Sequence, residues 1–154
     1  MTELKTDNSV PEFLRTEIND ASAIAEIENV CFTSKWTEKL IIEEISNKNS
    51  VSFVCKINNN IVGYIFFRYL FEEGEVLKIC VLPSFRKFGI GSSLMKKALE
   101  IAYENGVEKV FLEVRESNVP AISLYEKFGF CVYAKRSKYY PDNGEDALLM
   151  QKNL

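Results

Sequence analysis

Apolar and polar residues alternate along several short stretches of the chain, and elsewhere apolar residues recur every three or four positions. Alternation is typical of half-buried β-strands, and the longer spacing is typical of amphipathic helices. We therefore expect strands at 13–18, 51–57, 61–69, 75–82, 110–114, 131–139 and 146–152. Helices are expected at 21–31, 37–46, 89–105 and from Ser117 or Asn118 to Gly129. The resulting order, βααβββαβαββ, indicates a mixed α/β fold.

The chain has 154 residues, 47% of them hydrophobic, which suits one well-packed domain and is too short for two. We expect a single domain at 12–154, preceded by a flexible extension at 1–11. The chain has no run of about 18 apolar residues, so no membrane-spanning helix is predicted. The polar N terminus also lacks the apolar core of a signal peptide, so a cytoplasmic protein without a membrane partner is expected.

The chain contains no histidine, which excludes histidine-based triads and most zinc sites. Proton transfer then requires another group, and we expect a carboxylate base and no metal. A net charge of −3 argues against a nucleic-acid partner, because such proteins carry a basic face. Four well-separated cysteines with apolar neighbours, Cys31, Cys55, Cys80 and Cys131, predict buried free thiols rather than a disulfide.

The most informative segment is 75–94, where an apolar strand runs through a basic turn into a helix. A helix start leaves backbone N–H groups unpaired, and Gly89 and Gly91 remove side chains that would keep a phosphate at a distance. Arg86 and Lys87 add positive charge. The spacing Arg-x-x-Gly-x-Gly fits neither a P-loop nor a dinucleotide fingerprint, so an anion site and a merely tight connection both remain open.

A second informative segment, 110–130, begins as a strand with Val110, Leu112 and Val114 on one face. Glu113 is therefore a carboxylate on an otherwise apolar strand. Asn118 or Ser117 can cap the following helix. The three- and four-residue spacing within that helix places Tyr125 on its apolar side.

Three segments carry a family resemblance. The Arg-x-x-Gly-x-Gly turn resembles the pyrophosphate-binding signature of the GNAT acyl-CoA-dependent N-acetyltransferases. The segment 110–130 resembles that of the RimI-like branch, which acetylates N-terminal amines, and Tyr-Tyr-Pro-Asp-Asn-Gly-Glu-Asp-Ala at 139–147 resembles its hairpin over the peptide groove. Together the three segments span about half the chain.

The resemblance implies a single-domain GNAT fold, with a mixed seven-stranded sheet splayed between its fourth and fifth strands and about four flanking helices. It implies direct acetyl transfer from acetyl-CoA to the α-amine of a protein or peptide N terminus. The implied coenzyme A contacts are Ile79, Cys80, Val81, Arg86, Lys87, Phe88, Gly89, Ile90, Gly91, Ser92, Ser93, Asn118 and Tyr125.

The same resemblance makes Glu113 the candidate base and Tyr125 the candidate acid. Each has an alternative, a strand-end carboxylate for Glu113 and a core aromatic for Tyr125. Glu75 opens the strand on the acceptor side and is either a proton relay or a solvated carboxylate. Cys80 invites an acetyl-cysteine mechanism, but a strand cysteine between Ile79 and Val81 is more typical of a core position.

The implied peptide site comprises Phe32 and Trp36 in the loop 32–38, Glu75, and the tyrosines Tyr139 and Tyr140. Trp36 is equally compatible with a core anchor. Thr33 and Lys35 stand where RimI-like loops have prolines, so the sequence leaves the preferred substrate open, as it does any auxiliary subunit or ribosome association. A lysine side chain, polyamine or other small amine as acceptor, and a non-catalytic CoA-sensing or scaffolding module, are the competing hypotheses.

Overall fold

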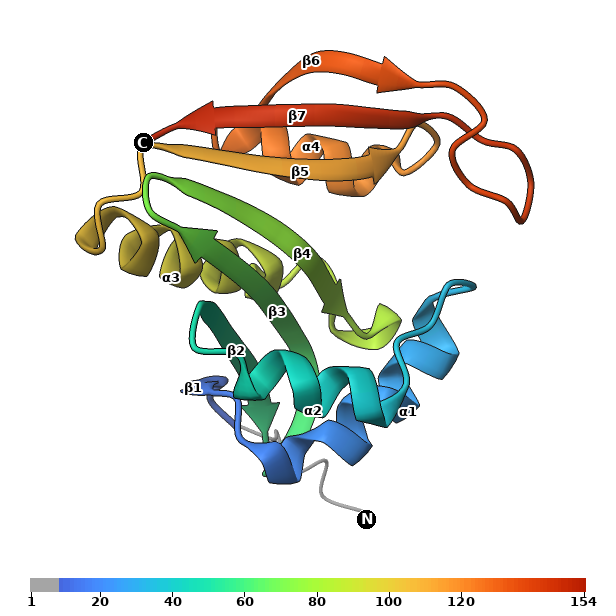
Figure 1. Ribbon diagram of the computed structural model, residues 1–154. Coiled ribbons are helices and arrows are strands. Elements are labelled where there is room, and N and C mark those ends of the chain that lie inside the picture. Colours follow the sequence, from blue (N-terminus) through green and yellow to red (C-terminus); the bar gives the residue numbers. More distant parts are fainter. Residues whose placement is uncertain (1–8) are drawn as a thin grey trace.

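The computed structural model describes residues 9–154 and forms one α/β domain (Figure 1). The strands are β1 (Glu12–Arg15), β2 (Ser50–Ile57), β3 (Asn60–Leu70), β4 (Glu73–Val81), β5 (Lys109–Arg115), β6 (Cys131–Arg136) and β7 (Ala147–Asn153). The helices are α1 (Ala21–Cys31), α2 (Glu38–Ser46), α3 (Ile90–Glu104) and α4 (Val119–Lys127), with short 3-10 turns η1 (Ile18–Asp20) and η2 (Pro83–Phe85).

The seven strands form one mixed sheet in the order β1-β2-β3-β4-β5-β7-β6. Neighbouring strands are antiparallel except β4 and β5, which are parallel and pair only from Glu73–Glu75 to Lys109–Phe111. Beyond those pairs the two strands diverge, and the split opens toward their carboxyl ends (Figure 1). The expected splay between the fourth and fifth strands is therefore confirmed.

A β-bulge in β4 changes which side chains face each side of the sheet. Phe66 pairs with Lys78 and Phe67 pairs with Val76, which leaves Leu77 as an extra residue. One inserted residue reverses the alternation of the side chains that follow it. Lys78 consequently lies on the side of α1, whereas Val76 packs on the side of α3.

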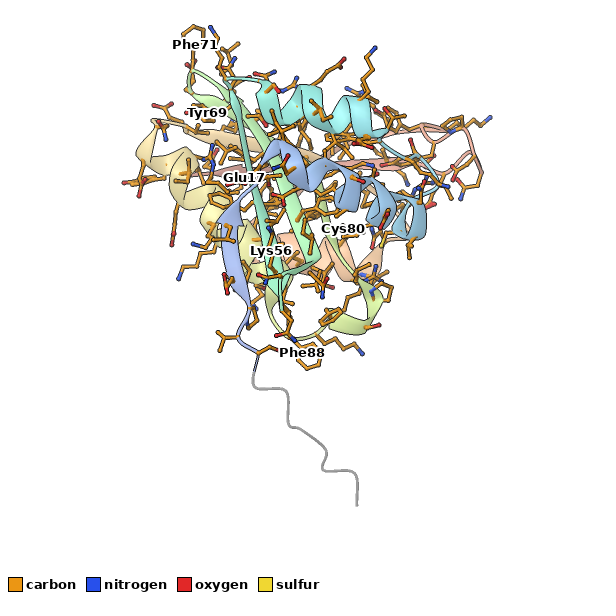
Figure 2. All side chains as sticks on the ribbon, turned by 90° about the horizontal axis from the view of Figure 1, so that it is seen from below. Glu17, Lys56, Tyr69, Phe71, Cys80 and Phe88 are labelled. Atoms are coloured by element: carbon orange, nitrogen blue, oxygen red, sulfur yellow. The ribbon has the colours of Figure 1, made fainter. Side chains whose placement is uncertain are left out.

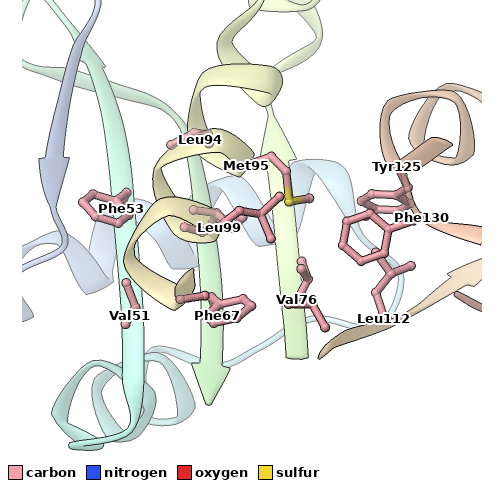
Figure 3. Packing of buried hydrophobic residues seen from close by; sticks show 14 of the residues in the cluster. Val51, Phe53, Phe67, Val76, Leu94, Met95, Leu99, Leu112, Tyr125 and Phe130 are labelled. Atoms are coloured by element: carbon pink, nitrogen blue, oxygen red, sulfur yellow. The ribbon is translucent and has the colours of Figure 1, made fainter. Parts of the chain in front are cut away.

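Two apolar clusters hold the helices to the sheet. On one face, α3 buries Leu94 and Leu99 and α4 buries Tyr125 against the sheet. On the other face, α1 and α2 bury Ile24 and Ile41 against the β2–β3 hairpin. Figure 3 shows Tyr125, Phe130 and Leu112 gathered on one side of the split, with Met95 and Val76 on the other. The first cluster therefore joins the two halves of the divided sheet.

Two of the predicted strands are shorter than expected. The first ends at Arg15, and Ile18 lies instead in η1, where the Asp20 carboxylate accepts a hydrogen bond from the Glu17 N–H at 2.8 Å. The sixth ends at Arg136 because Lys138 adopts a φ of 52°. The expected strands at 51–57 and 61–69 are joined by a tight turn, with Asn58 and Asn59 at φ values of 52° and 63°.

The cysteines differ from expectation in part. All four thiols are free and Cys55 and Cys80 are buried, but Cys31 is half-buried and Cys131 is exposed. The prediction of a buried Cys131 was wrong because β6 is an edge strand. Residues 1–8 of the predicted extension lie outside the described residues. Within 9–154, no helix is long and apolar enough to cross a membrane.

Candidate active site

The turn that leads from β4 into α3 leaves the helix N-terminus open. Gly89 is the N-cap at a φ of 79°, and its carbonyl accepts the first helical hydrogen bond from the Ser93 N–H at 3.0 Å. The Arg86 side chain bonds back to the Val81 carbonyl at 2.9 Å, which braces the turn. N–H groups in the first turn of a helix have no intrahelical acceptor, so this end of α3 suits an anion.

The two glycines of the turn contribute differently. At Gly89 an added Cβ would meet no atom within 4 Å, so the requirement there is the left-handed backbone. At Gly91 a Cβ would lie 3.5 Å from Leu124 and 3.8 Å from Val81, in the gap between α3 and α4. Phe88, 77% exposed, projects outward, and Figure 2 shows it at the opposite end of the molecule from Phe71.

The carboxyl half of β4 borders the split. Because β5 leaves β4 after Glu75, the backbone groups of Ile79 to Val81 that face β5 have no strand partner there. The Ile79 and Val81 side chains pack in the α3–α4 cluster, while Cys80 belongs to the opposite cluster. Burial, with a contribution from Cys31, raises the pKa of the Cys80 thiol to about 12. A buried, neutral thiol is a poor nucleophile, which disfavours an acetyl-cysteine mechanism.

Tyr125 lies on the α3–α4 side of the sheet. Asn118 caps its helix by accepting a hydrogen bond from the Ala121 N–H at 3.3 Å. Tyr125 is buried, and its ring packs edge-on against Phe130 at 6.0 Å. Burial, and to a smaller extent Tyr140, raises the pKa of the Tyr125 hydroxyl well above its usual range. The phenol therefore remains protonated at neutral pH and can donate a proton.

Glu113 lies on the opposite face of β5 and is exposed to a cleft. The Arg136 guanidinium lies 3.4 Å from its carboxylate. Tyr139 is the second partner, since hydrogen bonding to Glu113 is the main reason why the pKa of the Tyr139 hydroxyl is raised. Two side chains from the end of β6 and the loop after it thus hold the candidate base.

Glu75 and Glu113 line the same cleft, which has a volume of about 640 Å³. Partial burial, and then the neighbouring charge of Glu113, raise the pKa of Glu75, while Arg68 opposes the shift. Arg68, Tyr133 and Arg136 also line the cleft, and no sequence pattern had indicated them. Arg68 lies on β3, whereas Tyr133 and Arg136 lie on β6. Only the order of the strands in the sheet brings the three side chains together.

The loop between α1 and α2 forms one wall of the acceptor side. The half-buried Trp36 ring packs against Phe66, with 5.2 Å between the ring centroids. The backbone N–H of Trp36 donates a hydrogen bond to the Glu28 carboxylate at 3.0 Å. The Lys78 ammonium lies 4.2 Å from the Phe32 ring centroid and 5.2 Å from that of Trp36. Both candidate aromatics therefore contact Lys78, and Trp36 also anchors the loop to the core.

The loop between β6 and β7 forms the other wall. Tyr139 and Tyr140 pack edge to face at 5.1 Å, and Arg115 lies 3.9 Å above the Tyr140 ring. Arg115 also bonds Asp142 through both terminal nitrogens, at 3.1 and 3.0 Å. The Thr33 hydroxyl donates to Asp142 at 3.0 Å. The two walls therefore touch, and Figure 1 shows both loops at the open end of the split.

These features define an α/β protein whose sheet is split beside an anion-binding helix start, with a buried phenol on one face and carboxylates on the other. Among residues 9–154, no group of three or more histidine, cysteine, aspartate or glutamate side chains is placed to hold a metal ion. The chain belongs to the acetyltransferase (GNAT) family, whose model matches residues 21–130.

Named relatives agree with this assignment. An N-alpha-acetyltransferase of Sulfurisphaera tokodaii is 33% identical over 150 residues, covering 89% of each chain. The ribosomal protein bS18-alanine N-acetyltransferase of Escherichia coli is 30% identical over 136 residues, covering 87% of this chain and 91% of that one. The crystal structure of the Escherichia coli enzyme has a TM-score of 0.86 at 27% identity over 94% of both chains. Ard1 from Thermoplasma volcanium has a TM-score of 0.86 at 28% identity over 94% of this chain and 97% of that one.

Proposed function

We propose that this N-acetyltransferase transfers the acetyl group of acetyl-CoA to the α-amine of protein or peptide N termini. The observation that carries the proposal is the position of two proton-transfer groups beside the split, on opposite faces of the sheet. Tyr125 lies on the α3–α4 face and Glu113 on the acceptor face. The relatives named above for bS18-alanine and N-alpha acetylation support the choice of acceptor.

The residues around the split fit a coenzyme A pyrophosphate and pantetheine arm. The start of α3, from Lys87 to Ser93, offers backbone N–H groups and the left-handed Gly89. The unpaired edge of β4 at Ile79–Val81 offers backbone donors and acceptors for an amide-bearing chain. Asn118, which caps α4, and Tyr125 within α4 are the further contacts that we propose.

Acetyl-CoA supplies a thioester, so the reaction forms one C–N bond and breaks one C–S bond. In our proposal the Glu113 carboxylate receives the proton of the attacking amine, directly or through water. The Tyr125 hydroxyl donates a proton to the departing sulfur. Glu75 lies on the same cleft as Glu113 and is placed to extend a water relay.

A terminal amine loses its proton easily enough for Glu113 to act as its base. A terminal amine has a pKa near 8, so about a tenth is neutral at pH 7. A carboxylate assisted by water is then an adequate base. Tyr139 and Tyr140 on one wall and Phe32 and Trp36 on the other are the proposed contacts for the first residues of the peptide.

Mass spectrometry of a peptide library tests the proposal. Peptides that vary in their first two residues are incubated with acetyl-CoA, and fragment ions locate each acetyl group. We expect modification at the N-terminal nitrogen. Acetyl groups confined to lysine side chains, or an absence of any product across the library, would refute the proposed acceptor.

A further inference from the structure

We propose that Lys78 is a positioning residue that holds the acceptor loop, residues 32–37, against the strand that borders the acetyl-CoA site. The proposal deepens the function proposed above and rests on it for its kinetic prediction. Its structural prediction, the placement of the loop, can be tested without any substrate.

Lys78 contacts the acceptor loop at three points. Its ammonium donates to the Ser34 carbonyl at 3.1 Å. The same ammonium lies 4.2 Å from the Phe32 ring centroid and 5.2 Å from that of Trp36, within the range of cation–π attraction. One cation therefore contacts the first, middle and last parts of the loop.

A buried carboxylate holds that cation in place. Glu28 of α1 is fully buried and forms an ion pair with Lys78. It also accepts hydrogen bonds from the Tyr64 hydroxyl at 2.6 Å and from the backbone N–H of Trp36 at 3.0 Å. Glu28 thus links β3, β4 and the loop, and within residues 9–154 Lys78 is the cation that pairs with its charge.

The bulge at Leu77 connects this network to the acetyl-CoA side of the sheet. It turns Lys78 toward the loop, while the next residue, Ile79, packs on the α3–α4 face. Two adjacent residues of β4 therefore act on opposite faces of the sheet, Lys78 on the side of the acceptor loop and Ile79 on the side of the acetyl-CoA site. Loss of the Lys78 ammonium should free the loop and leave the α3 turn unchanged, since that turn makes its own contacts.

Lys78→Met removes the charge and keeps an unbranched apolar stem, whereas Lys78→Arg keeps a cation. The double variant Glu28→Gln/Lys78→Met removes both charges of the ion pair, so no uncompensated carboxylate remains to destabilise the fold. Lys56→Met is the matched control, because Lys56 forms a partly buried ion pair with Asp20 at 3.2 Å, away from the acceptor loop.

The first measurement is acrylamide quenching of tryptophan fluorescence. Trp36 is the chain's single tryptophan and lies in the acceptor loop, so its accessibility reports the loop's placement. We expect Lys78→Met and the double variant to increase the quenching constant, and Lys78→Arg and Lys56→Met to leave it near the wild-type value. Unchanged quenching in both variants that lack the ammonium would overturn the proposal.

The second measurement is steady-state kinetics with a peptide that the wild type acetylates at its α-amine. We expect KM for the peptide to rise about tenfold in Lys78→Met, with kcat and the acetyl-CoA dissociation constant nearly unchanged. The double variant should regain thermal stability and keep the raised KM. Recovery of KM together with stability would show a merely structural role and overturn the proposal. A wild type inactive on every peptide would instead refute the proposed function.

Discussion

Glu75 and Glu113 face the same cleft from β4 and β5, the two strands that separate just beyond Glu75. Two carboxylates that share a cleft repel each other when both are ionised. Partial burial is the main reason why the pKa of Glu75 is raised, and the charge of Glu113 adds to the shift. Glu113 itself has Arg136 as its ionic partner. Glu75 therefore gains its charge at a higher pH than an ordinary glutamate.

The first prediction concerns stability. Because the pKa of Glu75 is higher in the folded protein than in the unfolded chain, its contribution to stability is fully present in acid and is lost as pH rises through the folded value. Glu75→Gln should therefore raise the melting temperature relative to wild type at pH 7 and lose that advantage at pH 4. A difference that does not change with pH would contradict the assigned shift.

The second prediction concerns the candidate base. Glu113→Gln should slow transfer most at pH 6 and progressively less toward pH 9, where a terminal amine with a pKa near 8 is largely neutral without assistance. The measurement is kcat/KM for a peptide across this range. A defect of constant size from pH 6 to pH 9 would assign Glu113 to substrate positioning instead.

The third prediction concerns the candidate acid. Tyr125→Phe should lower kcat about 100- to 10,000-fold, the usual contribution of a general acid, with little change in KM for acetyl-CoA. Tyr103→Phe is the control, because Tyr103 is 70% exposed on α3. A fully active Tyr125→Phe enzyme would mean that the departing sulfur leaves without help from this hydroxyl.

The fourth prediction concerns coenzyme A binding. Gly89→Val places a β-branched residue at a φ of 79° beside the helix start, so it should weaken CoA binding in calorimetry. Gly106→Val is the matched control, since Gly106 has a φ of 81°, an equally open surrounding and a position at the far end of α3. The control should lose similar stability and keep its CoA affinity. Equal affinities in the two folded variants would refute the site.

The fold and the cofactor side could be predicted because their signals are local. The strand, the turn with Gly89 and the start of α3 are continuous in sequence, so helix-end chemistry identifies the segment. Glu113 stood out as a charge on an apolar strand, and Tyr125 by its helical spacing. In each case the residues that form the sequence signal are only a few positions away.

The acceptor side could be predicted only in part, because its contacts join distant segments. Thr33 and Asp142 are 109 residues apart, and Lys78 and Glu28 are 50 apart. The face on which Lys78 lies depends on a bulge that leaves no clear mark in the pattern of apolar residues. Strand alternation without that bulge would place Lys78 on the opposite face.

The most direct test of the account compares two peptides of matched sequence. One carries a free α-amine and no lysine, and the other has a blocked N terminus and one internal lysine. Initial rates with acetyl-CoA at pH 7.5 should strongly favour the free α-amine, because lysine has a pKa near 10.4 and under about 1% of it is neutral at this pH. Equal rates, or faster reaction of the lysine peptide, would contradict acetylation of N-terminal amines as the function of this site.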